Sequence, residues 1–122
     1  MGEVRLMAQF LVVDDEPIIA MTIADWLEDL GHGAVGPVAD LPTALALAEQ
    51  PLDAAILDVS LGAQTTLSVA RRLAERGLPF LVATGHNPAN IDAAFANGQV
   101  LSKPFGFESF RHAVERLLRR DP

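Results

Sequence analysis

The chain has 122 residues, a length that fits one domain with one hydrophobic core. Half of the residues are apolar and a fifth are charged, which is typical of a globular protein. The net charge of −7 argues against binding to the phosphate backbone of nucleic acid or to an anionic membrane surface. The lack of cysteine excludes disulfides and thiolate metal sites, and no apolar run is long enough to span a membrane. We therefore expect one cytoplasmic domain over residues 1–122, with its core at about 9–119.

Short apolar segments alternate along the chain with segments of helical periodicity. Pro17 suits the first turn of a helix, Asp40 suits an N-cap, and Gly31 and Gly77 suit helix ends. In chain order the pattern predicts strand 10–13, helix 18–30, strand 34–38, helix 40–49, strand 54–57, helix 65–76, strand 80–83, helix 89–97, strand 100–101 and helix 107–118.

This alternation predicts an α/β fold. Strands joined through helices run parallel with right-handed crossovers, so the helices cover both faces of one sheet in a three-layer sandwich. In such a sheet the functional site lies beyond the carboxyl ends of the strands, where the strand order reverses.

Polar residues follow four of the five predicted strands. They are Asp14, Asp15 and Glu16 after the first, Asp58 after the third, Thr84 after the fourth and Lys103 after the fifth. In a parallel sheet these side chains meet at one edge, where carboxylates repel by about 1 kcal/mol per pair in water and about 4 kcal/mol at a dielectric of 20. A hard cation such as Mg²⁺ or Mn²⁺ would offset this repulsion, as would Lys103, the only lysine in the chain. Attraction to the helix dipole is an alternative account of Glu16 and of one of the two aspartates that precede it, but it does not explain Asp58, which precedes a loop.

This set of residues resembles the receiver domain of two-component response regulators over essentially the whole chain. The resemblance rests on Asp14-Asp15, Asp58, Thr84 and Lys103-Pro104-Phe105. It implies a flavodoxin-like (βα)5 fold with a five-stranded parallel sheet in the order 2-1-3-4-5. The stretch 79–86 is also similar to a subset of stand-alone receivers that carry a Phe-Ala-Thr-Gly type motif after the fourth strand.

The resemblance further implies a chemistry for these positions. Asp58 would take a phosphoryl group from a phosphohistidine on a histidine kinase or a histidine phosphotransfer protein. Lys103 would pair with one phosphoryl oxygen, and the Thr84 hydroxyl would move to bond another. The implied ligands of Mg²⁺ are Asp15, Asp58, the backbone carbonyl of Ser60 and, through water, Asp14.

Phosphorylation would then switch a protein-binding surface made by helix 89–97, strand 100–101 and helix 107–118. Val100 stands where relatives usually carry an aromatic residue, so a Thr84 movement is not coupled to a ring there. The sequence leaves no room for an output domain after the last helix, so we expect output through a downstream protein or phosphoryl relay. We expect no enzymatic activity beyond the chain's own phosphorylation and dephosphorylation, and no direct contact with nucleic acid.

Two other functions share part of this chemistry. Aspartyl-phosphate phosphatases and mutases also use an aspartate nucleophile with Mg²⁺, but they carry Asp-x-Asp after the first strand, whereas Asp14 and Asp15 are adjacent here. A pseudo-receiver binds partners without phosphorylation and usually lacks an acid, the threonine or the lysine. None of these residues is missing from this chain.

Overall fold

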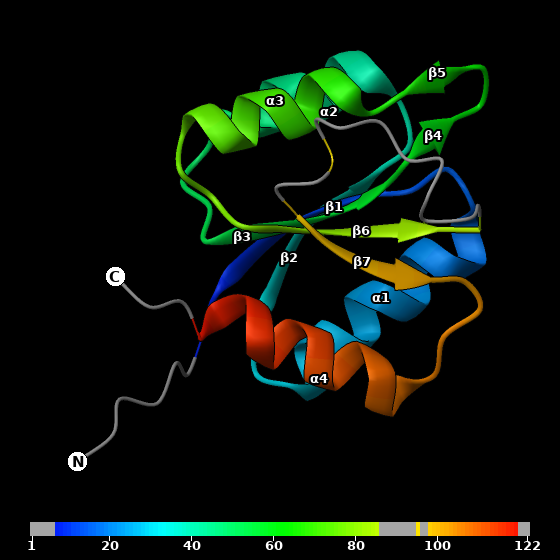
Figure 1. Cartoon of the computed structure of the whole chain (residues 1–122), viewed down its shortest axis with the longest axis vertical. Coiled ribbons are helices and arrows are strands. Elements are labelled where there is room, and N and C mark those ends of the chain that lie inside the picture. Colours follow the sequence, from blue (N-terminus) through cyan, green and yellow to red (C-terminus); the bar gives the residue numbers. More distant parts are fainter. Residues whose placement is uncertain (1–6, 86–94, 96–97, 120–122) are drawn as a thin grey trace.

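A computed structural model describes residues 7–85, 95 and 98–119 of the chain. Its five-stranded sheet is parallel throughout, with the order β2-β1-β3-β6-β7 (Figure 1). The strands are β1 (Gln9–Val13), β2 (Gly33–Val38), β3 (Ala54–Asp58), β6 (Phe80–Thr84) and β7 (Gln99–Ser102). In chain order of the sheet strands this is 2-1-3-4-5, which confirms the predicted α/β topology. All residues of β3 and β6 are buried, as the unbroken apolar runs predicted.

Four helices among the described residues cover the two faces of this sheet (Figure 1). Their bounds are α1 (Pro17–Asp29), α2 (Leu41–Leu47), α3 (Leu67–Glu75) and α4 (Phe107–Leu118). Helices α1 and α4 lie on one face, and α2 and α3 lie on the other. The predicted helix 89–97 lies outside the described residues, apart from Phe95, which is buried in the core.

The helix ends follow from local residue chemistry. Pro17 occupies the first turn of α1, where its missing N–H costs no hydrogen bond. The carboxylate of Asp40 accepts a hydrogen bond from the Thr43 amide at 3.0 Å, which confirms the predicted N-cap. Helix α2 ends at Leu47, two residues before the predicted end.

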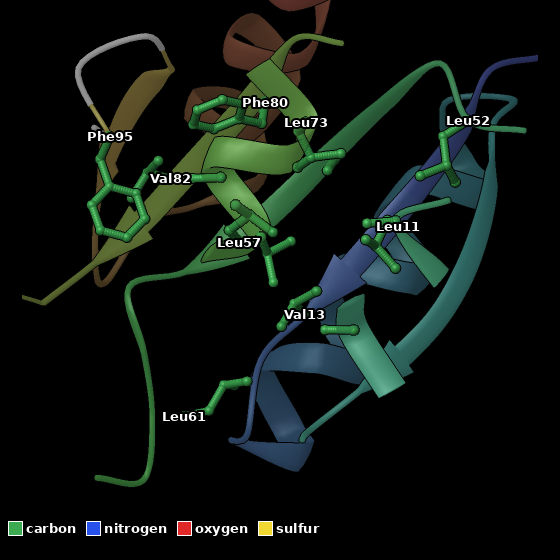
Figure 2. Packing of buried hydrophobic residues seen from close by; sticks show 14 residues of the cluster. Leu11, Val13, Leu52, Leu57, Leu61, Leu73, Phe80, Val82 and Phe95 are labelled. Carbon is green, nitrogen blue, oxygen red and sulfur yellow. The ribbon is translucent and has the colours of Figure 1, made fainter. Parts of the chain in front are cut away.

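Alternate strand residues point to opposite faces of the sheet, so the core forms two clusters. The cluster beneath α2 and α3 includes Leu11, Leu57, Leu73, Val82 and Phe95 (Figure 2). The cluster on the other face includes Phe10, Ile23, Ile56, Leu81 and Phe110. These two layers fix the ends of the strands, and therefore the residues that follow them.

A small hairpin follows β3, where the sequence predicts only a loop. Strands β4 (Ser60–Leu61) and β5 (Gln64–Thr65) pair antiparallel. Gly62 lies in the turn with φ of +61°, a conformation that favours glycine. The hairpin lies at the carboxyl-end edge of the main sheet (Figure 1).

Among the described residues, no helix combines the length and the apolar character that a bilayer crossing requires.

Candidate functional site

Three carboxylates gather at the carboxyl ends of β1 and β3. Asp58 ends β3, and Asp14 and Glu16 occupy the turn between β1 and α1. One oxygen from each lies within 4.8 Å of the others. Asp14 is buried and its Oδ1 accepts a hydrogen bond from the Glu16 amide at 2.9 Å, which folds this turn tightly. The turn thereby holds two acids beside Asp58.

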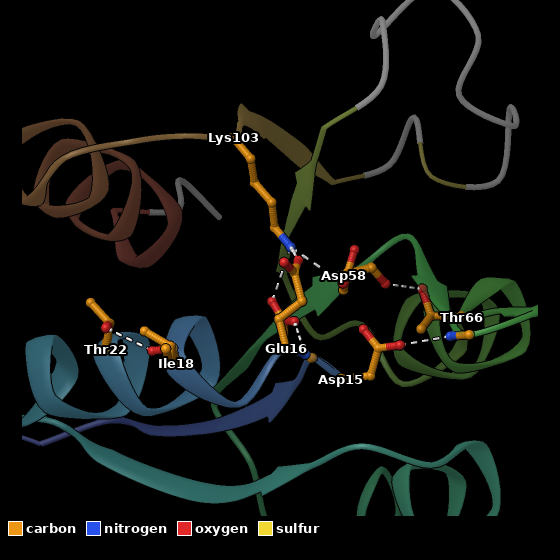
Figure 3. Close-up of polar contacts among 9 residues, drawn as sticks. Asp15, Glu16, Ile18, Thr22, Asp58, Thr66 and Lys103 are labelled. Carbon is orange, nitrogen blue, oxygen red and sulfur yellow. Dashed lines mark hydrogen bonds and ion pairs between the residues drawn. The ribbon is translucent and has the colours of Figure 1, made fainter.

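The ammonium of Lys103 lies among these three carboxylates (Figure 3). Its Nζ is 2.8 Å from Glu16 Oε1, and 3.3 Å from an Oδ2 of both Asp14 and Asp58. The backbone amide of Lys103 donates to the Thr84 carbonyl at 2.8 Å, which fixes the chain after β7 beside the end of β6. The side chain of Lys103 is 12% exposed, so its charge is only weakly screened by solvent.

Burial and neighbouring charges act in opposite directions on the pKa values of Asp58 and Lys103. Burial, and then the charge of Asp14, raise the pKa of Asp58 to about 6, although Lys103 acts in the opposite direction. Burial alone would lower the pKa of Lys103, but the hydrogen bond to Glu16 and the charges of Asp58 and Asp14 raise it above its usual value. Lys103 is therefore charged at neutral pH, and one ammonium faces three acids.

Asp15 makes a different contact from its neighbours. Its Oδ2 accepts a hydrogen bond from the Gly62 amide at 2.7 Å, so the side chain points to the β4–β5 hairpin (Figure 3). Ser60, whose carbonyl is an expected metal ligand, lies in the same hairpin and is partly buried. The hairpin therefore brings Ser60 to the edge of the sheet at which Asp15 lies.

Glu16 is the site residue that sequence reasoning undervalued. It is the N-cap residue of α1, yet its side chain makes no capping hydrogen bond and instead contacts Lys103. The predicted attraction to the helix dipole therefore does not describe its main contact. The presence of a single lysine opposite three consecutive acids was the signal in the sequence that could have suggested this pair.

The ligand chemistry of the cluster fits a hard divalent cation. All three clustered side chains offer carboxylate oxygens, the ligands that Mg²⁺ prefers. One ammonium faces three carboxylates here, so Lys103 alone does not offset the negative charge of the cluster. A divalent cation placed here would reduce the remaining repulsion between the carboxylates.

The two remaining predicted positions lie on neighbouring strands. Thr84 ends β6 and is buried, one residue beyond Ala83, which is paired with Asp58 across the sheet. Val100 lies in β7 and is 40% exposed. The structure thus places Thr84 at the same edge as the acids, and Val100 further back along its strand.

A cavity of about 550 Å³ opens beside the acids and extends along α1. Its polar end includes Asp15, Glu16, Asp58, Ser60 and Lys103. Its apolar end includes Ile19, Ile23, Trp26 and Phe105. The indole of Trp26 packs against Phe105, with ring centroids 6.2 Å apart. The cavity therefore offers both polar and apolar contacts to a group bound beside the carboxylates.

Comparisons with known proteins agree on one family. The model of the response regulator receiver domain matches residues 10–115. The two-component response regulator PhoP of Pseudomonas aeruginosa is 33% identical over 119 residues, covering 92% of this chain and 52% of its own length. This chain thus spans about half of that relative.

Solved structures show the same similarity. SdrG from Sphingomonas melonis Fr1 is 43% identical with a TM-score of 0.81, and the match covers 93% of this chain and 98% of that one. A response regulator from Burkholderia pseudomallei, solved with a phosphorylated aspartic acid and a calcium ion, is 29% identical with a TM-score of 0.75. That match covers 87% of this chain and 65% of the other.

Proposed function

Because the chain belongs to the response regulator receiver domain family, we propose that Asp58 accepts a phosphoryl group from a phosphohistidine donor. The observation that carries this proposal is the position of Asp58, which is buried at the end of β3, 3.3 Å from the Lys103 ammonium and facing the cavity. With a pKa of about 6, the carboxylate is ionised at neutral pH and available as a nucleophile.

In the transfer, an oxygen of the Asp58 carboxylate bonds to phosphorus while the bond from phosphorus to the donor's imidazole nitrogen breaks. Lys103 offsets negative charge on one phosphoryl oxygen, and the Thr84 hydroxyl donates to another. Little further covalent work is asked of the protein, because positioning and charge neutralisation supply most of the catalysis in phosphoryl transfer. The same residues act in hydrolysis of the acyl phosphate, and we propose no other enzymatic activity.

We propose that Mg²⁺, or Mn²⁺ in its place, assists this transfer. When bound, the cation supplies positive charge to the phosphoryl oxygens. Asp15, Asp58 and the Ser60 carbonyl would hold it directly, and Asp14 would hold it through water. Asp14 and Asp58 belong to the acid cluster, whose ligand atoms are all oxygens, and this supports their part in the set. The support for Asp15 and Ser60 is that both line the same cavity as Asp58.

We propose a histidine kinase or a histidine phosphotransfer protein as the donor and a downstream protein as the target. Ile18 and Met21 on α1 are large apolar side chains that are 81% and 64% exposed. They lie on the helix that lines the cavity, where a protein donor would contact the chain. The family and the negative net charge support a cytoplasmic signalling protein without direct contact to nucleic acid.

The target would read a surface that includes β7 and α4, together with residues 89–97. With Val100 in β7, the state of Asp58 would be reported through Thr84 and Gly85 without a rotating ring at that position. We further propose that residues 1–122 hold a single receiver domain, with the Phe-Ala-Thr-Gly type motif of the stand-alone subset.

One experiment tests the phosphoacceptor. The protein is incubated with acetyl phosphate and Mg²⁺, and its intact mass is measured beside Asp58→Asn and the exposed control Asp25→Asn. We expect one added phosphoryl group in the parent and in Asp25→Asn, and none in Asp58→Asn. A folded parent that gains no phosphoryl group would overturn the proposal. Sustained phosphate release from many small phosphate esters would instead favour a phosphatase.

A further inference from the structure

The hydroxyl and the amide of Thr66 hydrogen-bond the backbone carbonyls of Asp58, the proposed phosphoacceptor, and of Val59, which follows it. Thr66 is fully buried, and its hydroxyl lies 2.5 Å from the carbonyl oxygen of Asp58 and 3.2 Å from that of Val59. Its backbone amide donates to the Val59 carbonyl at 2.9 Å. Figure 3 shows the side chain directed at Asp58. Thr66 thus holds the carbonyl of Asp58 and the carbonyl of Val59, which lie on either side of the Val59 amide and α-carbon.

This arrangement differs from what a threonine at this place normally does. Thr66 is the N-cap residue of α3, and an N-cap hydroxyl usually accepts a hydrogen bond from an amide in the first helical turn. No such bond is present at Thr66, which donates its hydroxyl proton to β3 instead. The hydroxyl therefore stabilises the end of β3 and leaves the first turn of α3 without a side-chain cap.

Thr66 is itself held in place by helix α3. Its carbonyl accepts the first helical hydrogen bond of α3, from the Ala70 amide at 3.0 Å. Val69, Ala70 and Leu73 of the same helix are fully buried in the core. A displacement of the Asp58 carbonyl would therefore require either the loss of a short hydrogen bond or a movement of a packed helix.

From these contacts we infer that Thr66 is a positioning residue for phosphoryl transfer. The peptide groups that it holds connect Asp58, the proposed nucleophile, to Ser60, whose carbonyl is a proposed metal ligand. By fixing them, the hydroxyl sets the direction of the Asp58 side chain and of the Ser60 carbonyl together. The inference rests on the proposed function and adds to it the residue that aligns the two groups.

The test compares Thr66→Val, which keeps the shape and removes the hydroxyl, with Thr66→Ser, which keeps the hydroxyl. Thr65→Val is the matched control, because Thr65 is adjacent but exposed. Mg²⁺ affinity is measured by titration calorimetry, and the rate of phosphorylation by acetyl phosphate is measured from intact mass. We expect Thr66→Val to lose about tenfold in each, as is typical for residues that orient metal ligands. Thr66→Ser and Thr65→Val should stay within about threefold of the parent.

Equal values for Thr66→Val and the parent would overturn the inference, and so would a Thr66→Ser as impaired as Thr66→Val. Absence of phosphorylation in the parent would instead count against the proposed function. If the variants fold poorly, a measurement on the parent alone still tests the inference. The Thr66 methyl resonance should shift when Mg²⁺ is added, whereas that of the exposed Thr43 should not. An unmoved Thr66 methyl would contradict the inference.

Discussion

The proton affinity of Asp58 links this residue to the stability of the fold. Its pKa rises from 3.8 to about 6 on folding, because burial and Asp14 disfavour the charged form. The folded state therefore binds this proton more tightly than the unfolded state. It follows that stability attributable to Asp58 is highest below pH 3.8, decreases as the pH rises through about 6, and stays low above that pH.

Asp58→Asn should accordingly stabilise the protein in the absence of divalent cations. The amide cannot ionise, so we expect the free energy of unfolding at about pH 7.5 to increase by about 1 kcal/mol. At about pH 4 the difference from the parent should become small, because Asp58 is then largely protonated in the native state. Urea unfolding at both pH values, with Asp25→Asn as the surface control, measures this. A variant that is less stable than the parent at about pH 7.5 would contradict the expectation.

Residue roles were predictable where the residue type at a strand end left few alternatives. Asp58 and Lys103 stood out because an acid and the only lysine followed apolar strands. Glu16 and Thr66 could not be assigned in this way, since both precede helices and both residue types are common there. Their contacts depend on side-chain directions and on a hairpin that brings distant backbone together.

At the scale of elements, β6 and β7 approach closely at Gly98. A Cβ atom placed on Gly98 would lie 2.5 Å from two ring carbons of Phe80 and 2.8 Å from its carbonyl oxygen. Phe80 is buried, so its ring has little space into which it can move. The close approach aligns β7 with β6, and so places Lys103 beside Thr84.

Gly98→Ala should therefore destabilise the fold. We expect a loss of about 2 kcal/mol in the free energy of unfolding, a typical cost of overpacking in a filled core. Gly85→Ala is the control, because a Cβ atom there has no neighbour within 4 Å. Urea denaturation of both variants measures the difference. Equal free energies of unfolding for Gly98→Ala and Gly85→Ala would contradict this prediction, because β6 and β7 would then admit the added Cβ atom without a loss of stability.

The larger elements were predictable because apolar runs and helical periodicity repeat over many residues. Every predicted strand is present, and the helices of the described chain begin within two residues of their expected starts. The β4–β5 hairpin was not predicted, since strands of two residues carry no periodicity. Gly62 was its only local signal, and a glycine after Leu61 is equally compatible with an open loop.

At the scale of the whole molecule, the acid cluster should make thermal stability depend on cations. Lys103→Met removes the one ammonium among three carboxylates, and we expect it to lower stability without Mg²⁺ by about 2 kcal/mol. Added Mg²⁺ should stabilise the parent, by about 2.7 kcal/mol at a hundred times the dissociation constant. It should stabilise the variant by more, because the cation replaces the lost charge.

Thermal unfolding with and without MgCl₂, at constant ionic strength, checks this expectation. Arg116→Met is the matched control, since Arg116 is an exposed cation on α4. If Lys103→Met unfolded at the same temperature as the parent without Mg²⁺, the carboxylates would not depend on Lys103 for stability.

The cavity that joins the acids to Trp26 also has an optical consequence. Trp26 is the only tryptophan in the chain, and its indole lines the same space as Asp58 and Lys103. The ultraviolet emission of the protein therefore arises almost entirely from one fluorophore beside the site. A cation, a phosphoryl group or a docking protein that enters this space changes the surroundings of that fluorophore, so the chain carries its own label-free reporter of occupancy.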